Sequence, residues 1–225
     1  MAASSLASQS GLMARPKPLP RAEKSPVALL DPVAIRIGCR RGQVLSQAGW
    51  PTERLYRVLG GAAAKCAILS DGRRQIIDFA FPGDFFSFGC EDDVQHFLQA
   101  IVDDTLIACY PRVRVKMVAD ANPDVARALQ EVALEAAARA ERQILVLGQT
   151  TAPEKVVAFL LGMVQRLSGN GKDAVTLPVS RYEIADYLAI SAETVSRSLT
   201  ELRRRGAISI EGTRKIRILD RGSFE

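Results

Sequence analysis

Apolar residues in the first half of the chain come in short runs separated by turn residues. Between residues 30 and 120, runs such as 64–69 and 75–81 lie between glycine-containing turns that recur roughly every ten residues. Asp71-Gly72, which stands between these two runs, is a typical hairpin turn. The pattern predicts a small β-barrel or sandwich over this part of the chain.

The apolar spacing changes to steps of three and four residues after Asn122. Asn122, Pro123 and Asp124 suit the start of a helix, as the N-cap, the first helical residue and an acid that complements the helix dipole. The spacing predicts one helix of about seven turns that ends near Gly148. Its apolar stripe consists of Val125, Leu129, Val132, Ala136, Ala140, Ile144 and Leu147.

This stripe has two interpretations. It packs against the helix's own domain, or it forms a seam with a second copy of the chain. The small alanines in the stripe allow another backbone to approach closely, and we therefore favour the seam. The prediction is a homodimer whose interface contains all seven residues of the stripe.

A break between helices marks a domain boundary near residue 150. Thr151 and Glu154 form a capping box, which starts a new helix soon after Gly148. We predict a disordered tail over 1–25, a strand-rich domain over 26–120, a dimerisation helix over 121–149 and a separate C-terminal domain over 150–225.

Residues 180–206 predict two short helices joined by a tight turn. Ser180 and Glu183 form a second capping box, which opens a helix that runs through Leu188. Ser191 then caps another helix, and Gly206 ends it. Two helices joined in this way are typical of a helix-turn-helix.

The outward face of the second helix begins with Glu193, Ser196 and Arg197. A helix-turn-helix places the N-terminal residues of this helix against base edges in the major groove. Arg can bind guanine through two hydrogen bonds, and Glu can accept one from the cytosine amino group. In isolation, Glu193 and Arg197 would be an ordinary surface ion pair one helical turn apart. Their position favours base contacts instead, and we expect backbone contacts from Arg181, Thr194 and Lys215.

The net charge of the chain, +5, is concentrated near its C-terminus. Residues 197–217 contain seven Lys or Arg and two Asp or Glu, so this stretch alone carries five net positive charges. Four isoleucines flank a Glu211-Gly212-Thr213 turn here and predict a two-stranded wing. A basic surface suits DNA phosphates, although the arginine triplet 203–205 alone is typical of a solvated helix end.

Other chemistry has little support in the sequence. His96 is the sole histidine, and the spacing of Cys39, Cys66, Cys90 and Cys109 is too long for a zinc or iron–sulfur site. No nucleophile and base are recognisable together, so we predict no enzyme, no metal and no cofactor.

No apolar run reaches the ~20 residues that span a membrane, and the first 25 residues lack the apolar core of a secretory signal. We expect a cytoplasmic protein.

The chain resembles the Crp/Fnr family of bacterial transcription regulators. The residues that carry the resemblance are the turn segment 81–86 (Phe-Pro-Gly-Asp-Phe-Phe), the long helix, and the string Glu-Thr-Val-Ser-Arg at 193–197. Ser196 matches the Glu-x-x-Ser-Arg pattern of the Fnr and FixK branch, whereas the catabolite-activator branch has glycine at this position. The resemblance implies an α+β fold with an N-terminal β-roll (a jelly roll like that of cyclic-nucleotide-binding domains), a long dimerisation helix and a C-terminal winged helix-turn-helix. It also implies an activator that binds a TTG-N8-CAA-type palindrome in double-stranded DNA and contacts RNA polymerase.

Two departures from the family pattern narrow this resemblance. Cyclic-AMP binders in the family carry an Arg-Ser pair after the Gly-Asp-Phe turn, whereas this chain has no Arg or Lys between Arg74 and Arg112 and has acids at 91–93. We therefore expect the roll pocket to lack basic residues and to repel a phosphate. Residues 1–38 contain no cysteine for an iron–sulfur centre, which leaves the FixK-like subgroup. A regulator gated by an unidentified ligand or haem in the roll, and a small-molecule sensor with a secondary DNA motif, are the alternatives.

Overall fold

The computed structural model describes residues 25–45, 54–87, 95–149, 151–168, 174–212 and 214–220. Its first part consists of the 3-10 helix η1 (Pro26–Val33) and two antiparallel sheets, ordered β1-β7-β2-β5 and β4-β3-β6. The strands are β1 (Ile35–Cys39), β2 (Arg54–Gly60), β3 (Ala63–Ile68), β4 (Arg74–Ala80), β5 (Phe85–Phe86), β6 (Gln95–Ala100) and β7 (Thr105–Pro111).

The two sheets share a buried core, as the predicted β-roll requires. Val58 and Ile107 of one sheet and Ala63 and Leu98 of the other are all fully buried in it. The β3–β4 hairpin turns at the predicted residues, where Gly72 has φ +81°, a conformation that favours glycine. The predicted roll and hairpin are confirmed.

The prediction of strands up to residue 120 is wrong at its end. After β7, residues Arg112–Ala121 form helix α1. Apolar and basic residues alternate at 112–116, which is a strand-like period. Pro111, the last residue of β7, has no N–H group to donate to the ladder, and the helix that follows buries Val115 against η1 and the start of the long helix. Tertiary packing therefore overrides the local pattern.

The long helix α2 (Pro123–Leu147) has the predicted bounds, and Gly148 lies at its C-cap. Asn122 is its N-cap, as predicted, but the side chain makes no capping hydrogen bond, and its Nδ2 group donates to the Val118 carbonyl at the end of α1 (3.2 Å). Helix α3 (Ala152–Leu167) opens with the predicted Thr151–Glu154 capping box.

The C-terminal part contains β8 (Ala174–Thr176), α4 (Arg181–Leu188), α5 (Ala192–Arg204), β9 (Ile208–Glu211) and β10 (Lys215–Ile218). Strands β9 and β10 form the predicted wing, and β8 adds a third strand in the order β8-β10-β9. The sequence did not predict β8, because three residues are too few to establish a period.

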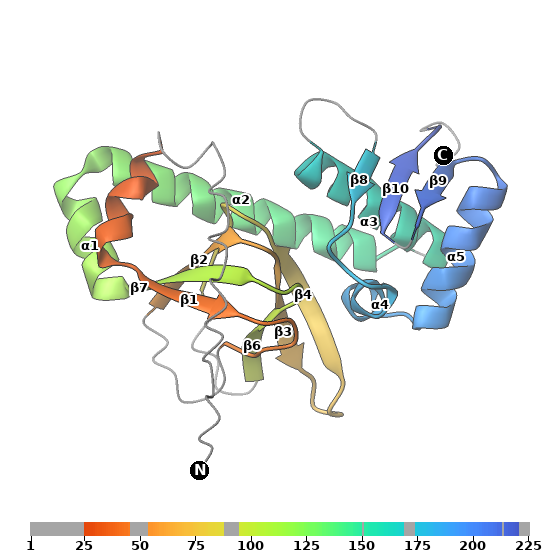
Figure 1. The fold of residues 1–225 in the computed structure, drawn as a ribbon, viewed down its shortest axis with the longest axis horizontal. Helices are drawn as coiled ribbons and strands as arrows, with labels where there is room; N and C mark the ends of the chain where they lie inside the picture. The colour runs from red at the N-terminus through yellow and green to blue at the C-terminus, as the bar shows by residue number, and fades with distance from the viewer. Residues whose placement is uncertain are drawn as a thin grey trace, which may run out of the picture.

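Helix α2 runs along the molecule and joins its two parts (Figure 1). The roll and α1 lie toward its N-terminal end, and α3, α4, α5 and the wing lie toward its C-terminal end. One hydrophobic cluster crosses between the parts: the Phe79 ring of β4 lies 5.0 Å from that of Tyr187 and 6.2 Å from that of Phe159. Among the helices described, none is long and apolar enough to cross a membrane.

A cluster of four charged residues also joins the roll to α2 and α3. Asp78 accepts from Arg139 Nε (3.0 Å) and lies 3.3 Å from Arg166 Nη1. Asp84 accepts from Arg166 Nη2 (2.7 Å) and from the Phe81 N–H (2.8 Å), which fixes its own turn. Arg139 and Arg166 are mostly buried, and the Arg166 guanidinium also lies 4.8 Å from the centre of the Phe81 ring. We call these residues (Asp78, Asp84, Arg139, Arg166) the ionic cluster.

Strand β4 also holds helix α4 directly. Arg74 Nε donates to Asp186 (2.9 Å), and the Gln75 amide donates to the Asp186 carbonyl (2.6 Å). Gln143 of α2 donates to the Tyr187 carbonyl (2.7 Å). The first helix of the helix-turn-helix therefore packs against both the roll and α2.

Candidate nucleic-acid interface

Capping interactions fix both helices of the predicted helix-turn-helix. Ser180 Oγ accepts from the Glu183 N–H (3.3 Å), and the Glu183 carboxylate accepts from the Ser180 N–H. Ser191 Oγ accepts from the N–H of Thr194 (3.1 Å) at the start of α5. Between the helices, Ala189 has φ +53°, the left-handed conformation that makes the turn tight. The predicted helices, caps and turn are confirmed.

One face of α5 is buried and the other is open. Val195, Leu199 and Leu202 are at most 5% exposed and anchor the helix in the core. On the outer face, the Glu193 and Arg197 side chains are 70% and 79% exposed. The amphipathic spacing thus fixes which side chains α5 presents to solvent.

Glu193 and Arg197 form the ion pair that the alternative interpretation expected. Both groups are highly exposed, so the pair contributes only about 0.2–0.5 kcal/mol to helix stability. It is weak enough to rearrange when a stronger partner is present. The pair is therefore compatible with a base-reading role and does not exclude it.

Ser196 and Arg181 contact each other across the two helices. Ser196 Oγ donates to the Ala192 carbonyl (2.9 Å) and accepts from Arg181 Nη1 (3.2 Å). Tyr182, the neighbour of Arg181, is 74% exposed. The sequence did not single out Tyr182, although an exposed aromatic residue at the start of α4 could have suggested it.

The two other predicted backbone contacts already have partners. The hydroxyl of Thr194 shares a hydrogen bond with that of Ser191 (2.8 Å), so it belongs to the N-cap of α5. Lys215 pairs with Glu211 across β9 and β10, and this hydrogen bond lowers the pKa of Glu211. These bonds do not exclude a phosphate contact, because the Lys215 ammonium has further N–H donors and the Thr194 hydroxyl can donate while it accepts from Ser191.

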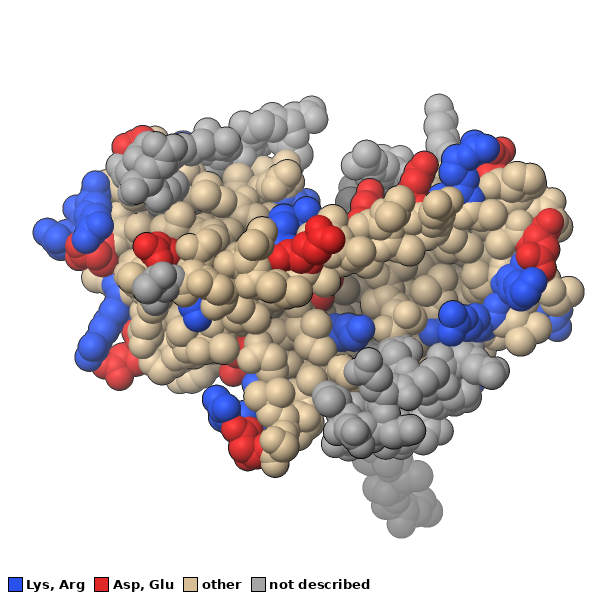
Figure 2. Space-filling view, turned by 180° about the vertical axis from the view of Figure 1, so that it is seen from behind, with Lys and Arg blue, Asp and Glu red and all other residues tan. Residues whose placement is uncertain are grey.

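The arginine triplet at the end of α5 behaves largely as a solvated helix end. Arg204 and Arg205 both bond to Glu201, and their hydrogen bonds lower the pKa of this carboxyl to about 2. Basic side chains gather nevertheless at the end of the molecule that carries α5 and the wing, seen on the left in Figure 2. Others lie at the opposite end, so charge alone does not define the interface.

Comparison with known proteins agrees with this geometry. A family model described as a Crp-like helix-turn-helix domain matches residues 154–225. The chain is 36% identical over 178 residues to the nitrogen fixation regulation protein FixK of Rhizobium meliloti (strain 1021), and the match covers 79% of this chain and 80% of that protein. It is 30% identical over 206 residues to the transcriptional activator protein FnrL of Cereibacter sphaeroides, covering 89% of this chain and 83% of FnrL.

A solved structure supports the same relationship. FixK2 from Bradyrhizobium japonicum has a TM-score of 0.75 and 35% sequence identity, over 85% of this chain and 96% of that chain. The chain belongs to the Crp/Fnr family of transcription regulators. The resemblance to its FixK-like branch is confirmed, and the family consists of DNA-binding regulators, not enzymes.

In this Crp/Fnr protein, the apolar stripe on α2 divides into two parts. Val125 is fully buried within its own chain, and Leu129 and Val132 pack against the same cluster, which contains η1 and α1. Val125 therefore cannot contact a second copy, whereas Leu129 and Val132 are half-buried and keep surface that a second copy could cover. Ala140 and Ile144 are exposed, Ile144 by 69%. The remaining members, Ala136 and Leu147, are half-buried.

A neighbouring face of α2, which shares Ile144 with the predicted stripe, carries large exposed apolar side chains. Leu134, Ile144 and Leu145 are 62%, 69% and 68% exposed. Ile144 and Leu145 follow Leu134 by about three helical turns, so the three lie on one side of the helix. Ala137 is exposed between them. We call these four residues the apolar face of α2.

The roll contains a cavity of about 380 Å³ against α2. Its apolar lining includes Phe85, Val132 and Ala136. The expectation that this pocket lacks basic residues is wrong, because four cations line it: Arg54, Lys65, Arg112 and Arg139. They come from β2, β3, α1 and α2, outside the segment between Arg74 and Arg112 from which the expectation was drawn.

Three of these cations are already engaged by the protein. Lys65 Nζ donates to the Ser87 carbonyl (3.1 Å), and burial lowers the pKa of Lys65. Arg54 Nη1 donates to Cys109 Sγ (3.5 Å), and Arg139 belongs to the ionic cluster. The acidic segment 91–93 lies outside the described residues.

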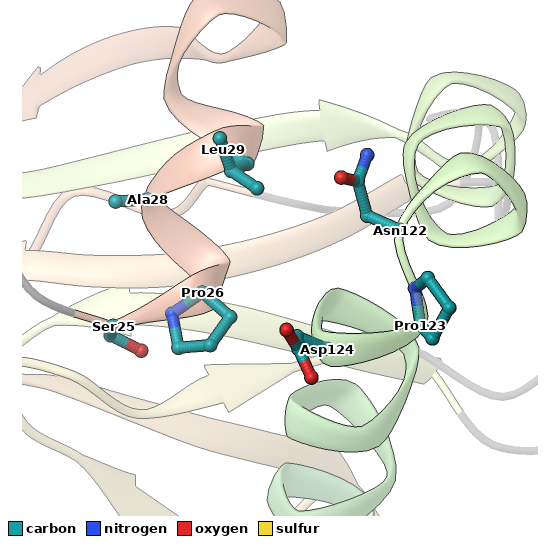
Figure 3. Close-up of a pocket in the computed structure, with 7 residues that line it drawn as sticks. All are labelled: Ser25, Pro26, Ala28, Leu29, Asn122, Pro123 and Asp124. Carbon is teal, nitrogen blue, oxygen red and sulfur yellow. The ribbon is translucent and has the colours of Figure 1, made fainter.

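A second hollow, of about 420 Å³, lies between η1 and the junction of α1 and α2 (Figure 3). Ser25, Pro26 and Leu29 line one side, and Asn122 and Asp124 line the other. Asp124 is the one charged residue in this lining, and its carboxylate already accepts from Arg127 (3.3 Å). This hollow therefore offers little chemistry for a ligand.

The three described cysteines and the histidine occupy ordinary structural positions. Cys39, Cys66 and Cys109 are buried free thiols, and burial raises the pKa of Cys66 to about 12. Cys90 lies outside the described residues. His96 is half-buried on β6. Within the described ranges, no group of His, Cys, Asp and Glu could hold a metal ion.

Proposed function

We propose that this Crp/Fnr regulator binds a TTG-N8-CAA-type palindrome as a homodimer. One α5 would enter each of two successive major grooves, ~34–36 Å apart. The observation that carries the proposal is the start of α5, where a capped and anchored helix presents Glu193 and Arg197 to solvent. Ser196 lies beside them on the same helix.

The contacts divide by role. We propose that Glu193, Ser196 and Arg197 meet base edges, and that Arg181, Thr194 and Lys215 contact the phosphate backbone. The roll (26–120) would act as a sensor-like domain, α2 as the dimerisation helix, and residues 150–225 as the DNA-binding domain. FnrL is named as a transcriptional activator. By analogy we propose that this chain activates transcription through RNA polymerase.

The apolar face of α2 supports the homodimer. Leu134, Ile144 and Leu145 would expose a row of large apolar side chains in a monomer. Pairing two such helices would bury the row, and Ala137 between them would let the backbones approach. We therefore place the seam on this face and on the exposed Ala140 and Ile144 of the predicted stripe.

The decisive experiment is a titration of the purified protein against two duplexes at fixed salt. One duplex carries the palindrome, and the other has the same composition in scrambled order. We expect binding to the palindrome to be at least 10³-fold tighter, as is typical of specific regulators. Analytical ultracentrifugation of the complex should give two chains per palindrome. Equal affinity for both duplexes would overturn the proposal.

A regulator gated by a ligand in the roll is the second candidate, and the cavity between the roll and α2 favours it. Native mass spectrometry of the purified protein would detect a bound small molecule, and haem would show by its visible absorbance. A protein that carries no added mass and still binds the palindrome tightly would contradict this candidate. The same result would exclude a sensor in which the DNA motif is secondary.

A further inference from the structure

The hydrogen bond between the two helices assigns a role to Ser196 beyond contact with a base. We propose that Ser196 is a positioning residue that holds the Arg181 guanidinium on the DNA-facing side of α5. The inference rests on the proposed function, since it concerns how the same surface recognises DNA.

The bonding of the Ser196 hydroxyl supports this role. Its single proton is directed to the Ala192 carbonyl (2.9 Å), and one of its two lone pairs accepts from Arg181 Nη1 (3.2 Å). A hydroxyl bonded in this way has no proton left for the thymine or guanine oxygens. It can face a base only as an acceptor through one lone pair, so its stronger effect is on Arg181.

Arg181 gains a defined position from this bond. It is the first residue of α4, and its exposed side chain would otherwise sample many rotamers. Ser196 lies between Glu193 and Arg197 in sequence, on the helix that carries both. The bond therefore brings a third charged group beside these two. It uses one of five guanidinium N–H groups, which leaves the others for a phosphate or a base.

A double-mutant cycle tests the proposal. We expect Arg181→Ala to weaken binding to the palindrome about tenfold, and Ser196→Ala to weaken it about fivefold. The double variant should bind no worse than Arg181→Ala alone, because the hydroxyl acts through the guanidinium. Ser196→Thr keeps the hydroxyl and should restore most of the affinity.

The salt dependence of binding gives a readout that an uncharged contact would not change. Ser196→Ala removes no charge, yet a displaced Arg181 should release fewer counterions. Arg181→Ala loses one phosphate contact, so its slope of log affinity against log salt should be shallower than that of the wild type by about 0.9. The slope of Ser196→Ala should fall toward the same value. Thr200→Ala is the matched control, because Thr200 Oγ1 makes the same type of bond within α5, to the Ser196 carbonyl (2.9 Å). This control should leave the slope unchanged.

The outcomes distinguish a failure of the positioning role of Ser196 from a failure of the proposed palindrome binding. Independent effects of the two substitutions, with an unchanged salt slope for Ser196→Ala, would overturn the positioning role while the palindrome preference of the wild type stands. A wild-type protein without palindrome preference would instead overturn the proposed function, and this inference with it. Thermal unfolding of each variant identifies any loss that comes from misfolding.

Discussion

At the residue scale, substitutions test the proposed division between base and phosphate contacts, because Arg197 and Lys215 are both exposed and both ion-paired in the structure. We expect Arg197→Ala to cost about 1–3 kcal/mol on the palindrome and to relax discrimination at one base pair, because a guanidinium can make two bonds to a guanine. Titrations against duplexes with single base-pair changes would identify that position. The control is Lys215→Ala, which should weaken specific and random DNA alike and flatten the salt slope by about one. If Arg197→Ala also weakened both duplexes equally, Arg197 would be a phosphate contact.

The Glu201 carboxyl gives a pH-dependent prediction. Hydrogen bonds from Arg204 and Arg205 lower its pKa from 4.5 to about 2 in the folded protein. A lowered pKa stabilises the fold above the ordinary value, and this contribution is lost as the pH falls from about 4.5 toward 2. The carboxyl is exposed, so the contribution is small and salt-sensitive. An NMR titration of the Glu201 side chain should show the low midpoint, and a midpoint near 4.5 would contradict the two bonds.

Residue patterns predicted the helix starts of the C-terminal part well because their signals are local. The capping boxes at Thr151 and Ser180 each join residues only three positions apart, and both are present in the structure. The contact between Arg181 and Ser196 joins residues 15 positions apart on two helices, and its geometry depends on how these helices cross. No local spacing encodes that crossing. The cations of the roll cavity escaped prediction for the same reason, since they come from four separate elements.

At the element scale, α2 shows both the strength and the limit of periodicity. The three- and four-residue spacing gave the bounds of the helix correctly. It did not reveal which apolar side meets the chain's own domain, because η1 and α1 were not predicted as helices. These elements cover Val125 and leave Leu134, Ile144 and Leu145 exposed.

The apolar face of α2 leads to a prediction about assembly. Ile144→Glu would place a charge in the proposed seam, where burying an unpaired carboxylate is unfavourable. We expect the variant to sediment as a monomer and to lose at least about tenfold in affinity for the palindrome. Arg142→Glu is the control, since it adds the same side chain to another side of α2 and should remain dimeric. A dimeric Ile144→Glu variant with normal DNA binding would show that the seam lies elsewhere.

At the scale of the whole molecule, the ionic cluster and the β4–α4 contacts hold the DNA-binding domain at a defined place on the roll. A dimer that reads two half-sites needs its recognition helices at a fixed separation. Within the chain, these contacts link the roll directly to α2, α3 and α4. Arg166 of α3 bonds to Asp84 and to the Phe79 carbonyl of the roll, and it also pairs with Asp78.

Arg166→Ala tests this link. The Arg166 guanidinium lies 2.7 Å from the Asp84 carboxylate, whereas that of Arg139 lies 3.8 Å away. Removing Arg166 therefore leaves Asp84 without its closest cation. We expect the free energy of unfolding to fall by about 1–3 kcal/mol, the usual effect of losing hydrogen bonds to a charged group that is largely buried. Chemical denaturation would measure the change. The control is Arg204→Ala, whose ion pair with Glu201 is exposed and should contribute less than about 1 kcal/mol.

The same variant should also alter how strictly the protein requires the spacing of its half-sites. If the ionic cluster holds the two parts of each chain together, Arg166→Ala should bind palindromes with one base pair inserted or deleted at the centre nearly as well as the original. The wild type should reject them, because one base pair moves the second half-site by about 3.4 Å and turns it around the duplex. Arg204→Ala should keep the strict requirement. Equal rejection of the altered palindromes by Arg166→Ala would mean that α2 and the β4–α4 contacts hold the separation without the ionic cluster, and that Arg166 serves stability alone.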